Sequence, residues 1–270
     1  MTSTVDDAPR DDHEASEKQR SAAMDPDAAA KFPLHEAARE GQVSKAENLL
    51  KVDTLFYPTN PKLANEKDVD ERYAIHWAVA NKHMAIIDML MEQKGFDPDV
   101  QCQDSSGWTP LMMAASLPNS DGDAIIEKLL ARGADVNMKT NMGQNALHFA
   151  TSKQNISTVK LLLQNKCSAR VKDRRGQLAL HRAAAVGSTP IAKLLLTQGK
   201  SPLNATDNDG MTALHHAIAE GNGDCAVMLI KEGAETDKEN VDGDLAINLA
   251  PDKKVKEFIV QSAKREGIDL

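Results

Sequence analysis

The sequence is poor in the residue types that other classes of protein depend on. Aromatic residues make up 3% of its 270 residues, and it has three cysteines, Cys102, Cys167 and Cys225. The cysteines lie far apart and form no C-x-x-C pair, so their odd count does not favour a disulfide framework. We therefore expect a reducing compartment, in which disulfides are rare.

Long apolar runs and an excess of positive charge are also lacking. No apolar run approaches 18 residues, which excludes a helix that spans a membrane, and the first residues lack the pattern of a secretory signal. The net charge of -8 gives no broad attraction to phosphate groups. We therefore expect neither a membrane nor a nucleic acid as a partner.

The sequence motifs of common enzymes are missing as well. None of the patterns G-x-x-x-x-G-K-[ST], G-x-G-x-x-G, G-x-S-x-G and H-E-x-x-H occurs, and no nucleophile has a base at suitable spacing. The sequence therefore predicts a protein that is not an enzyme and that needs no cofactor.

A repeated segment extends along almost the whole chain. The stretch Ala179-Leu180-His181-Arg182-Ala183-Ala184 recurs with drift, at steps of 41, 36, 36, 33, 34 and 33 residues. A turn with aspartate and glycine, such as Asp173–Gly176, precedes the segment, and apolar residues at helical spacing follow it. The positions aligned with His181 are His35, His76, Met112, His148, His215 and Asn248.

This period and motif resemble those of ankyrin repeats. The resemblance implies an all-α solenoid of about seven helix-turn-helix repeats with short β-hairpin turns. An array of this kind usually holds a protein partner. The expected repeats lie near residues 30–65, 66–102, 103–138, 139–171, 172–205, 206–238 and 239–270, within a repeat domain of residues 29–270.

Three segments depart from this pattern. Residues 1–28 are acidic and polar, which predicts a disordered tail or, as an alternative, a helix that docks on a partner. Tyr57–Pro61 has two prolines, which predict an enlarged loop without a helix. Leu117–Gly122 lengthens the connection between two helices, either as a partner contact or as surface drift.

The repeated histidines invite a metal or catalytic interpretation. Neighbouring repeats stack roughly 10 Å apart, a spacing inferred from helix packing. That distance is too long for two of them to share one ion. We therefore expect each histidine to bond the backbone or a threonine within its own turn, and we expect no metal site.

The repeat also predicts which residues face the concave side of the array. They are the hairpin tip, the residue after the hairpin glycine, the end of the first helix and the residue after the histidine. Trp77 has inter-repeat packing as an equally weighted alternative, whereas Trp108, on a hairpin, is harder to explain as core. The residues expected to contact a partner are Asp70, Arg72, Trp77, Trp108, Met113, Phe149, Lys153, Arg175 and Arg182.

Charge along this face falls into bands. The second repeat is acidic around Asp68 and Asp70, the middle is basic around Arg174 and Arg175, and the end is acidic again around Asp207. The bands predict a protein partner with an acidic patch between basic ones. The alternative is ordinary solvated charge at hairpin tips.

Several exposed motifs resemble the gankyrin family, in particular its fungal members. These are Asp70-Glu71-Arg72-Tyr73-Ala74-Ile75-His76-Trp77, Ser106-Gly107-Trp108-Thr109-Pro110, His181-Arg182-Ala183-Ala184-Ala185, and Ala219-Glu220-Gly221-Asn222-Gly223-Asp224 with Ala226-Val227. The resemblance covers roughly residues 32–260.

The resemblance implies an assembly chaperone of the 26S proteasome regulatory particle, found in cytoplasm and nucleus and monomeric when free. Its concave groove would hold the C-terminal helical domain of one AAA+ ATPase subunit of the base. The family's contact positions match Asp70, Arg72, Trp108 and Lys153, with Arg182 as a further shared residue.

Two family features are missing. Ser105 replaces a family acidic residue, and the L-x-C-x-E motif of animal gankyrins is absent from Glu220–Ala226. The alternative function is a generic ankyrin adaptor for a kinase or a transcription factor. A third, weaker class is an enzyme subunit that presents a substrate.

Overall fold

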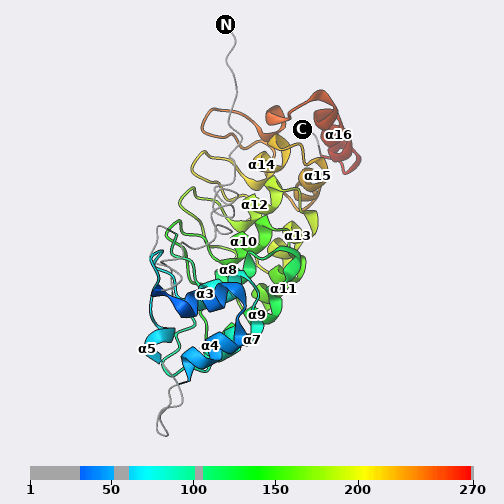
Figure 1. Cartoon of the computed structure of the whole chain (residues 1–270). Helices are drawn as coiled ribbons and strands as arrows, with labels where there is room; N and C mark the ends of the chain where they lie inside the picture. Colours follow the sequence, from blue (N-terminus) through cyan, green and yellow to red (C-terminus); the bar gives the residue numbers. More distant parts are fainter. Residues whose placement is uncertain (1–30, 52–60, 101–105, 269–270) are drawn as a thin grey trace.

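The computed structural model of the chain describes residues 31–51, 61–100 and 106–268, and these form a curved stack of helix pairs (Figure 1). The predicted all-α solenoid is confirmed. The first helices of the pairs are α3 (Pro33–Glu40), α6 (Ala74–Ala80), α8 (Pro110–Ala115), α10 (Ala146–Ser152), α12 (Ala179–Ala185) and α14 (Ala213–Ala219), followed by the 3-10 turn η2 (Ala246–Leu249). The second helices are α4 (Val43–Leu50), α7 (Met84–Met91), α9 (Asp123–Ala131), α11 (Ile156–Gln164), α13 (Thr189–Thr197), α15 (Gly223–Lys231) and α16 (Lys253–Arg265).

The two rows of helices bury the core between them. Each first helix packs on the first helix of the next repeat, as α12 does on α14, and the second helices α11, α13 and α15 form a parallel outer row. The first helices are rich in alanine, which favours helix and lets neighbouring backbones come close. Leu180 and Leu129 are fully buried in this layer. Each predicted repeat range holds one pair, although the boundaries themselves stay predictions.

Short hairpins project from the helices and stack on one another. Within the fifth hairpin, Asp173 N–H donates to the Gln177 carbonyl at 2.9 Å. Arg174 N–H donates to the Met142 carbonyl of the preceding hairpin at 2.9 Å. These bonds join the hairpins into a continuous layer (Figure 1). Within the described ranges this layer contains isolated β-bridges, such as Lys67 with Tyr73, and no regular strand.

The lengthened connection of the third repeat is part of the packed structure. It contains the 3-10 turn η1 (Pro118–Ser120). The Asn155 side chain donates to the Leu117 carbonyl at 2.6 Å and accepts the Ser120 N–H at 3.2 Å. A Cβ added to Gly122 would lie 2.0 Å from the Ala114 carbonyl oxygen, so only glycine fits there. The connection is therefore fixed against the fourth repeat.

One expectation about the first insertion is wrong. Pro61 begins the single-turn helix α5 (Pro61–Ala64), because proline is tolerated at the first position of a helix, where its missing N–H has no intrahelical partner. The rest of the insertion, Tyr57 to Asn60, and the acidic tail of residues 1–28 lie outside the described residues.

The last helix covers the open end of the core. Asp252 caps α16 by accepting the Val255 N–H at 2.9 Å. Ile259 and Ala263 are buried against α15, whereas Lys253 and Lys254 face solvent. A polar outer face over an apolar stripe is what a terminal repeat needs to remain soluble.

Candidate functional site

The repeated histidines hold the hairpins to the helices and are closed to ligands. Nδ1 of His181 accepts the Leu178 N–H at 3.0 Å, and Nε2 donates to the Ala205 carbonyl at 3.1 Å. His76 and His148 are bonded in the same way. The Nδ1 bond lies within the histidine's own turn, as the sequence predicts, whereas the Nε2 bond reaches a loop further along the chain.

Both ring nitrogens of these histidines are used in the neutral form. Burial lowers the pKa of His76, His148 and His181 to about 4. No group of three or more His, Cys, Asp or Glu residues in the described part of the chain could hold a metal ion. The hydrogen bonds of these side chains therefore provide a frame for a surface.

An aspartate in three of the hairpins fastens the residue that follows the histidine. Its Oδ1 accepts two backbone N–H groups of the hairpin, and its Oδ2 contacts a side chain nine residues further on. The three pairs are Asp68 with Trp77, Asp173 with Arg182, and Asp207 with His216.

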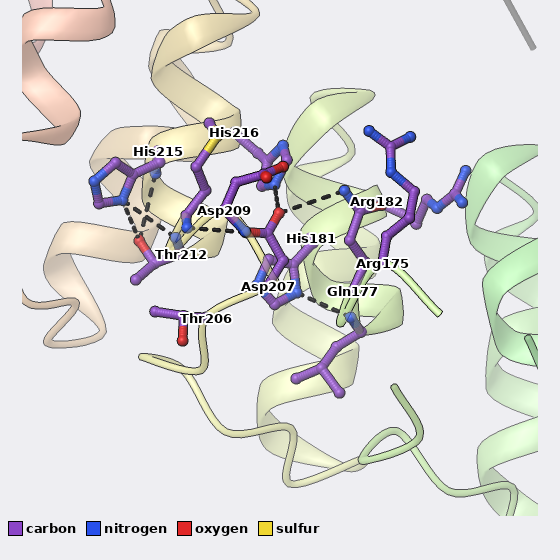
Figure 2. A network of polar contacts seen from close by, with 12 residues as sticks. Arg175, Gln177, His181, Arg182, Thr206, Asp207, Asp209, Thr212, His215 and His216 are labelled. Atoms are coloured by element: carbon purple, nitrogen blue, oxygen red, sulfur yellow. Dashed lines mark hydrogen bonds and ion pairs between the residues drawn. The ribbon is translucent and has the colours of Figure 1, made fainter. Parts of the chain in front are cut away.

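The pair in the sixth repeat shows this arrangement most fully (Figure 2). His216 Nε2 lies 2.8 Å from Asp207 Oδ2, and Asp207 Oδ1 accepts the Asp209 and Met211 N–H groups at 3.0 and 2.9 Å. Burial raises the pKa of Asp207, but the hydrogen bonds from His216 and Met211 outweigh burial and leave that pKa lowered. The carboxylate is therefore held ionised under the concave face.

At the second repeat, the same position carries an aromatic ring with a cation above it. Trp77 Nε1 donates to Asp68 Oδ2 at 2.6 Å, and Trp77 is 6% exposed. The Arg72 guanidinium carbon lies 5.1 Å from the Trp77 ring centre, within the range of a cation–π contact. Asp70 is exposed at the tip of the same hairpin. Asp70, Arg72 and Trp77 thus form one local cluster.

Trp108 differs from its expectation. It is 8% exposed, belongs to the hydrophobic core and stacks on Phe149 with ring centres 4.0 Å apart. Met113 is buried beside them in the same core. An aromatic pair at this spacing stabilises the contact between two repeats. Packing between repeats therefore accounts for most of the surface of Trp108, and the prediction that it resists explanation as core is wrong.

The remaining predicted contact residues are more accessible. Arg175 is exposed at the tip of the fifth hairpin, and Lys153 is half-buried at the end of α10. Arg182 is half-buried, and its Nη2 lies 3.4 Å from Asp173 Oδ2. The predicted site residues come from four consecutive repeats, the second to the fifth, and are spread along the array.

The acidic bands of this face are narrower than the sequence predicts. Asp68 and Asp207 are 4% and 7% exposed, and their oxygens bond the hairpins. Asp70, Asp209 and Asp242 are exposed and still carry charge to the tips. The sequence carried a signal for the aspartates that bond the hairpin. Each lies three residues before a residue with positive φ, namely Glu71, Gly176 or Gly210, and nine residues before the side chain that its Oδ2 contacts.

Two other sequence features have a plain structural position. Cys167 and Cys225 are buried free thiols, and burial raises their pKa to about 12 and about 11. Cys102 lies outside the described residues. None of the helices described here is long and apolar enough to cross a membrane.

Comparison with known families and proteins identifies the repeat. A family model of ankyrin repeats, in three copies, matches residues 34–140, 119–203 and 147–242. A Saccharomyces cerevisiae protein named probable 26S proteasome regulatory subunit p28 is 37% identical over 178 residues, which are 64% of this chain and 72% of that protein. A Schizosaccharomyces pombe ankyrin repeat-containing protein, C6C3.08, is 36% identical over 213 residues, which are 78% of this chain and 89% of that protein.

Solved structures agree with the fold. The ankyrin repeat domain of human ASB11 superposes with a TM-score of 0.71 at 23% identity, over 85% of this chain and 97% of that one. The ankyrin repeat domain of Bcl-3 gives 0.68 at 23% identity, over 84% and 97%. At this identity the likeness concerns the fold alone.

Proposed function

The chain belongs to the ankyrin-repeat proteins and, within them, to the gankyrin family, and from this premise we propose that it is a non-catalytic chaperone for assembly of the 26S proteasome regulatory particle. Its concave face would hold the C-terminal helical domain of one AAA+ ATPase subunit of the base. The observation that carries the proposal is the similarity to the S. cerevisiae protein, which is named a probable 26S proteasome regulatory subunit.

The layout of the concave face supports a protein partner. Asp70, Arg72, Lys153 and Arg175 place charges of both signs along four repeats. Such charge patterns determine the register and the association rate of a partner more than its affinity. A helical domain with acidic groups opposite the basic middle repeats would match this pattern.

The burial of the residues of this face supports different roles for the charged and the aromatic ones. Trp77 and Trp108 are mostly buried, so they form the floor of the surface and do not project as anchors. Arg72, which lies over Trp77, presents its charge at that floor. The contact energy of the proposed complex would therefore come mainly from Asp70, Arg72, Lys153, Arg175 and Arg182.

Ankyrin-repeat relatives are protein-interaction modules. We infer a protein that acts by binding alone, in the cytoplasm and the nucleus, and that is monomeric when free. Because the surface is charged, binding of the ATPase domain would weaken as the salt concentration rises.

The proposal is tested with the purified full-length chain and the C-terminal domains of the base ATPase subunits, one at a time, by isothermal titration calorimetry. We expect one domain to bind and the others to bind at least tenfold more weakly. Arg72→Glu/Lys153→Glu should weaken that binding by tenfold or more, because each new carboxylate repels the acidic partner surface.

A matched control carries the same charge change elsewhere. Arg265→Glu/Lys264→Glu alters two exposed cations on α16, outside the concave face, and should leave binding unchanged. If no base ATPase domain binds, the generic adaptor becomes the better explanation. Equal losses in the two variants would keep the ATPase partner but move the site.

A further inference from the structure

The fourth and fifth repeats carry a local excess of positive charge, and only part of it belongs to residues of the concave site. Residues 136–206 contain eleven lysines and arginines and a single acid, Asp173, in a chain whose net charge is -8. Asp173 is 8% exposed and its oxygens bond the hairpin and Arg182. Nearly all of this positive charge therefore lacks an acidic counterpart in its own segment.

Five exposed cations of this segment lie on the loops that join these repeats, and we call them the basic belt: Lys166, Arg170, Lys172, Arg174 and Lys200. Arg170 Nη1 donates to the Lys200 carbonyl at 3.2 Å, and Lys172 Nζ donates to the Thr206 carbonyl at 2.6 Å. These bonds tie Arg170 to the loop at Lys200 and Lys172 to the backbone at Thr206. Among the described residues, no belt cation has a carboxylate within 4.0 Å.

The belt shares no residue with the proposed ATPase site. Asp173 Oδ2 lies 3.4 Å from Nη2 of Arg182, a residue of that site. The adjacent residue Lys172 instead donates its Nζ to the Thr206 carbonyl at 2.6 Å. The belt therefore offers cations that the proposed ATPase site does not use.

Acidic loops border the belt at both ends. Asp97 and Asp135 precede it on the equivalent loops of earlier repeats, and Glu235 and Asp237 follow it on a later loop, all of them exposed. A long polyanion such as a nucleic acid would meet repulsion at both borders. A short acidic peptide segment fits the two repeats between them, a length of roughly 20 Å or about six extended residues.

We propose that the basic belt binds the acidic segment of residues 6–17 of the same molecule. This segment has six acids, Asp6, Asp7, Asp11, Asp12, Glu14 and Glu17, and one basic residue, Arg10. The fifth repeat lies about four repeat steps, or roughly 40 Å, from the first. The fourteen residues from Glu17 to Lys31 span up to about 46–50 Å when extended, so the segment reaches the belt.

The segment and the belt belong to one chain, and this covalent connection explains how exposed charges could hold the segment. Separate exposed ion pairs are weak and are screened by salt. Within one chain, however, the effective concentration of the segment is in the millimolar range, so a weak contact is populated. The contact does not depend on any partner of the concave face.

The first test is zero-length carbodiimide cross-linking of the full-length protein at low salt, followed by mass spectrometry. Carboxylates of residues 6–17 should be joined to Lys166, Lys172 or Lys200 within monomers, and these links should disappear at high salt. Links found only in dimers, or found equally on the α16 lysines Lys254 and Lys264, would overturn the proposal.

The second test measures competition. A fluorescein-labelled peptide with the sequence of residues 1–28 is titrated with the full-length chain. Neutralising the six acids of residues 6–17 in that chain (Asp→Asn, Glu→Gln) should tighten peptide binding about tenfold, because the chain's own segment no longer competes. Equal affinity of the neutralised and the wild-type chain would show that the belt is empty and the proposal wrong.

Matched variants in the neutralised chain locate the contact. Arg170→Gln/Lys172→Gln/Lys200→Gln should weaken peptide binding about tenfold, whereas Lys254→Gln/Lys264→Gln/Arg265→Gln, with the same charge change on α16, should not. A loss in both variants, or equally tight binding of a single-stranded oligonucleotide, would contradict a peptide site on the belt. No ATPase domain takes part, so this outcome is independent of the proposed chaperone function.

Discussion

The hairpins of the second and the sixth repeats have the same frame but different contacts at the concave face. In each, an aspartate, Asp68 or Asp207, accepts the backbone N–H groups two and four residues further on at 2.9–3.0 Å. Its second oxygen then meets the indole of Trp77 in one repeat and the imidazole of His216 in the other. The backbone is therefore held by one device, while the residue shown to a partner changes.

This difference separates what folding needs from what binding can vary. An indole N–H can only donate a hydrogen bond, whereas an imidazole can donate or accept one. The second repeat consequently presents a fixed aromatic wall beneath Arg72, and the sixth presents a ring nitrogen that can donate or accept a hydrogen bond. Variation at one position can thus change the character of the surface without disturbing the hairpin.

The hydrogen bonds of the buried histidines, which hold the hairpins to the helices, can be tested by measuring stability at low pH. Because His76, His148 and His181 have a pKa of about 4 when folded and about 6.5 when unfolded, the unfolded chain binds more protons between these values. The free energy of unfolding should therefore fall as the pH drops from 6.5 to 4, by about 1.4 kcal/mol per pH unit for each histidine. Urea unfolding at pH 7.5, 6 and 5 measures this loss.

The variant His76→Asn checks the assignment. It should start from a lower stability at pH 7.5 but lose less on acidification, by about 1.4 kcal/mol per pH unit. His76 lies in the second repeat, so a reduced slope would show that its frame titrates as the mechanism requires. A slope equal to that of the unmodified chain would mean that other groups cause the acid sensitivity.

The difference between the two pairs can be tested by replacing each aspartate with asparagine. Asp68→Asn turns an amide donor toward the indole donor of Trp77 and should cost about 1–3 kcal/mol of stability. Asp207→Asn can donate its amide to the His216 ring nitrogen, which can accept as well as donate, and should cost less than about 1 kcal/mol. Urea unfolding at pH 8, above the usual titration range of imidazole, gives both values.

Alanine at the same two positions serves as the control. Asp68→Ala and Asp207→Ala each leave two backbone N–H groups without their acceptor, so their costs should be similar. Asn240 accepts the equivalent N–H groups in the last hairpin at 2.8–3.0 Å, so asparagine itself is compatible with the turn. Equal costs for the two asparagine variants would remove the proposed distinction between indole and imidazole.

The repeat determined most of what the sequence could predict. A period near 33 residues with one apolar stripe per helix is enough to predict the helix pairs, and the Nδ1 bonds of His148 and His181 within their own turns follow from that motif. The insertion was harder to predict, because proline excludes the interior of a helix but not its first turn, where Pro61 lies. The rule that proline excludes a helix failed there, because proline disrupts the interior of a helix but is tolerated in its first turn.

The site was predictable in position but not in exposure. The period correctly identifies Trp77 and Phe149 as equivalent positions. It does not tell how deeply the side chain at such a position is buried. Trp108 is buried because Phe149 of the next repeat stacks on it, a contact between residues 41 apart. Asp68 likewise reads as a surface charge until its bonds to the hairpin are known.

The variant Arg175→Ala has the smallest expected effect on stability, and it tests whether this residue belongs to the binding surface or to the hydrogen-bonded frame of the hairpins. Arg175 is exposed at the tip of the fifth hairpin, and its carbonyl, which a substitution retains, accepts the Asn208 N–H at 3.0 Å. Arg175→Ala should therefore change the free energy of unfolding by less than about 0.5 kcal/mol. The same variant should weaken binding of the ATPase domain at low salt and reduce its salt dependence, because one long-range attraction is lost. Calorimetric titration at two salt concentrations, beside urea unfolding, measures both effects. A large loss of stability with unchanged binding would place Arg175 in the frame and not in the binding surface.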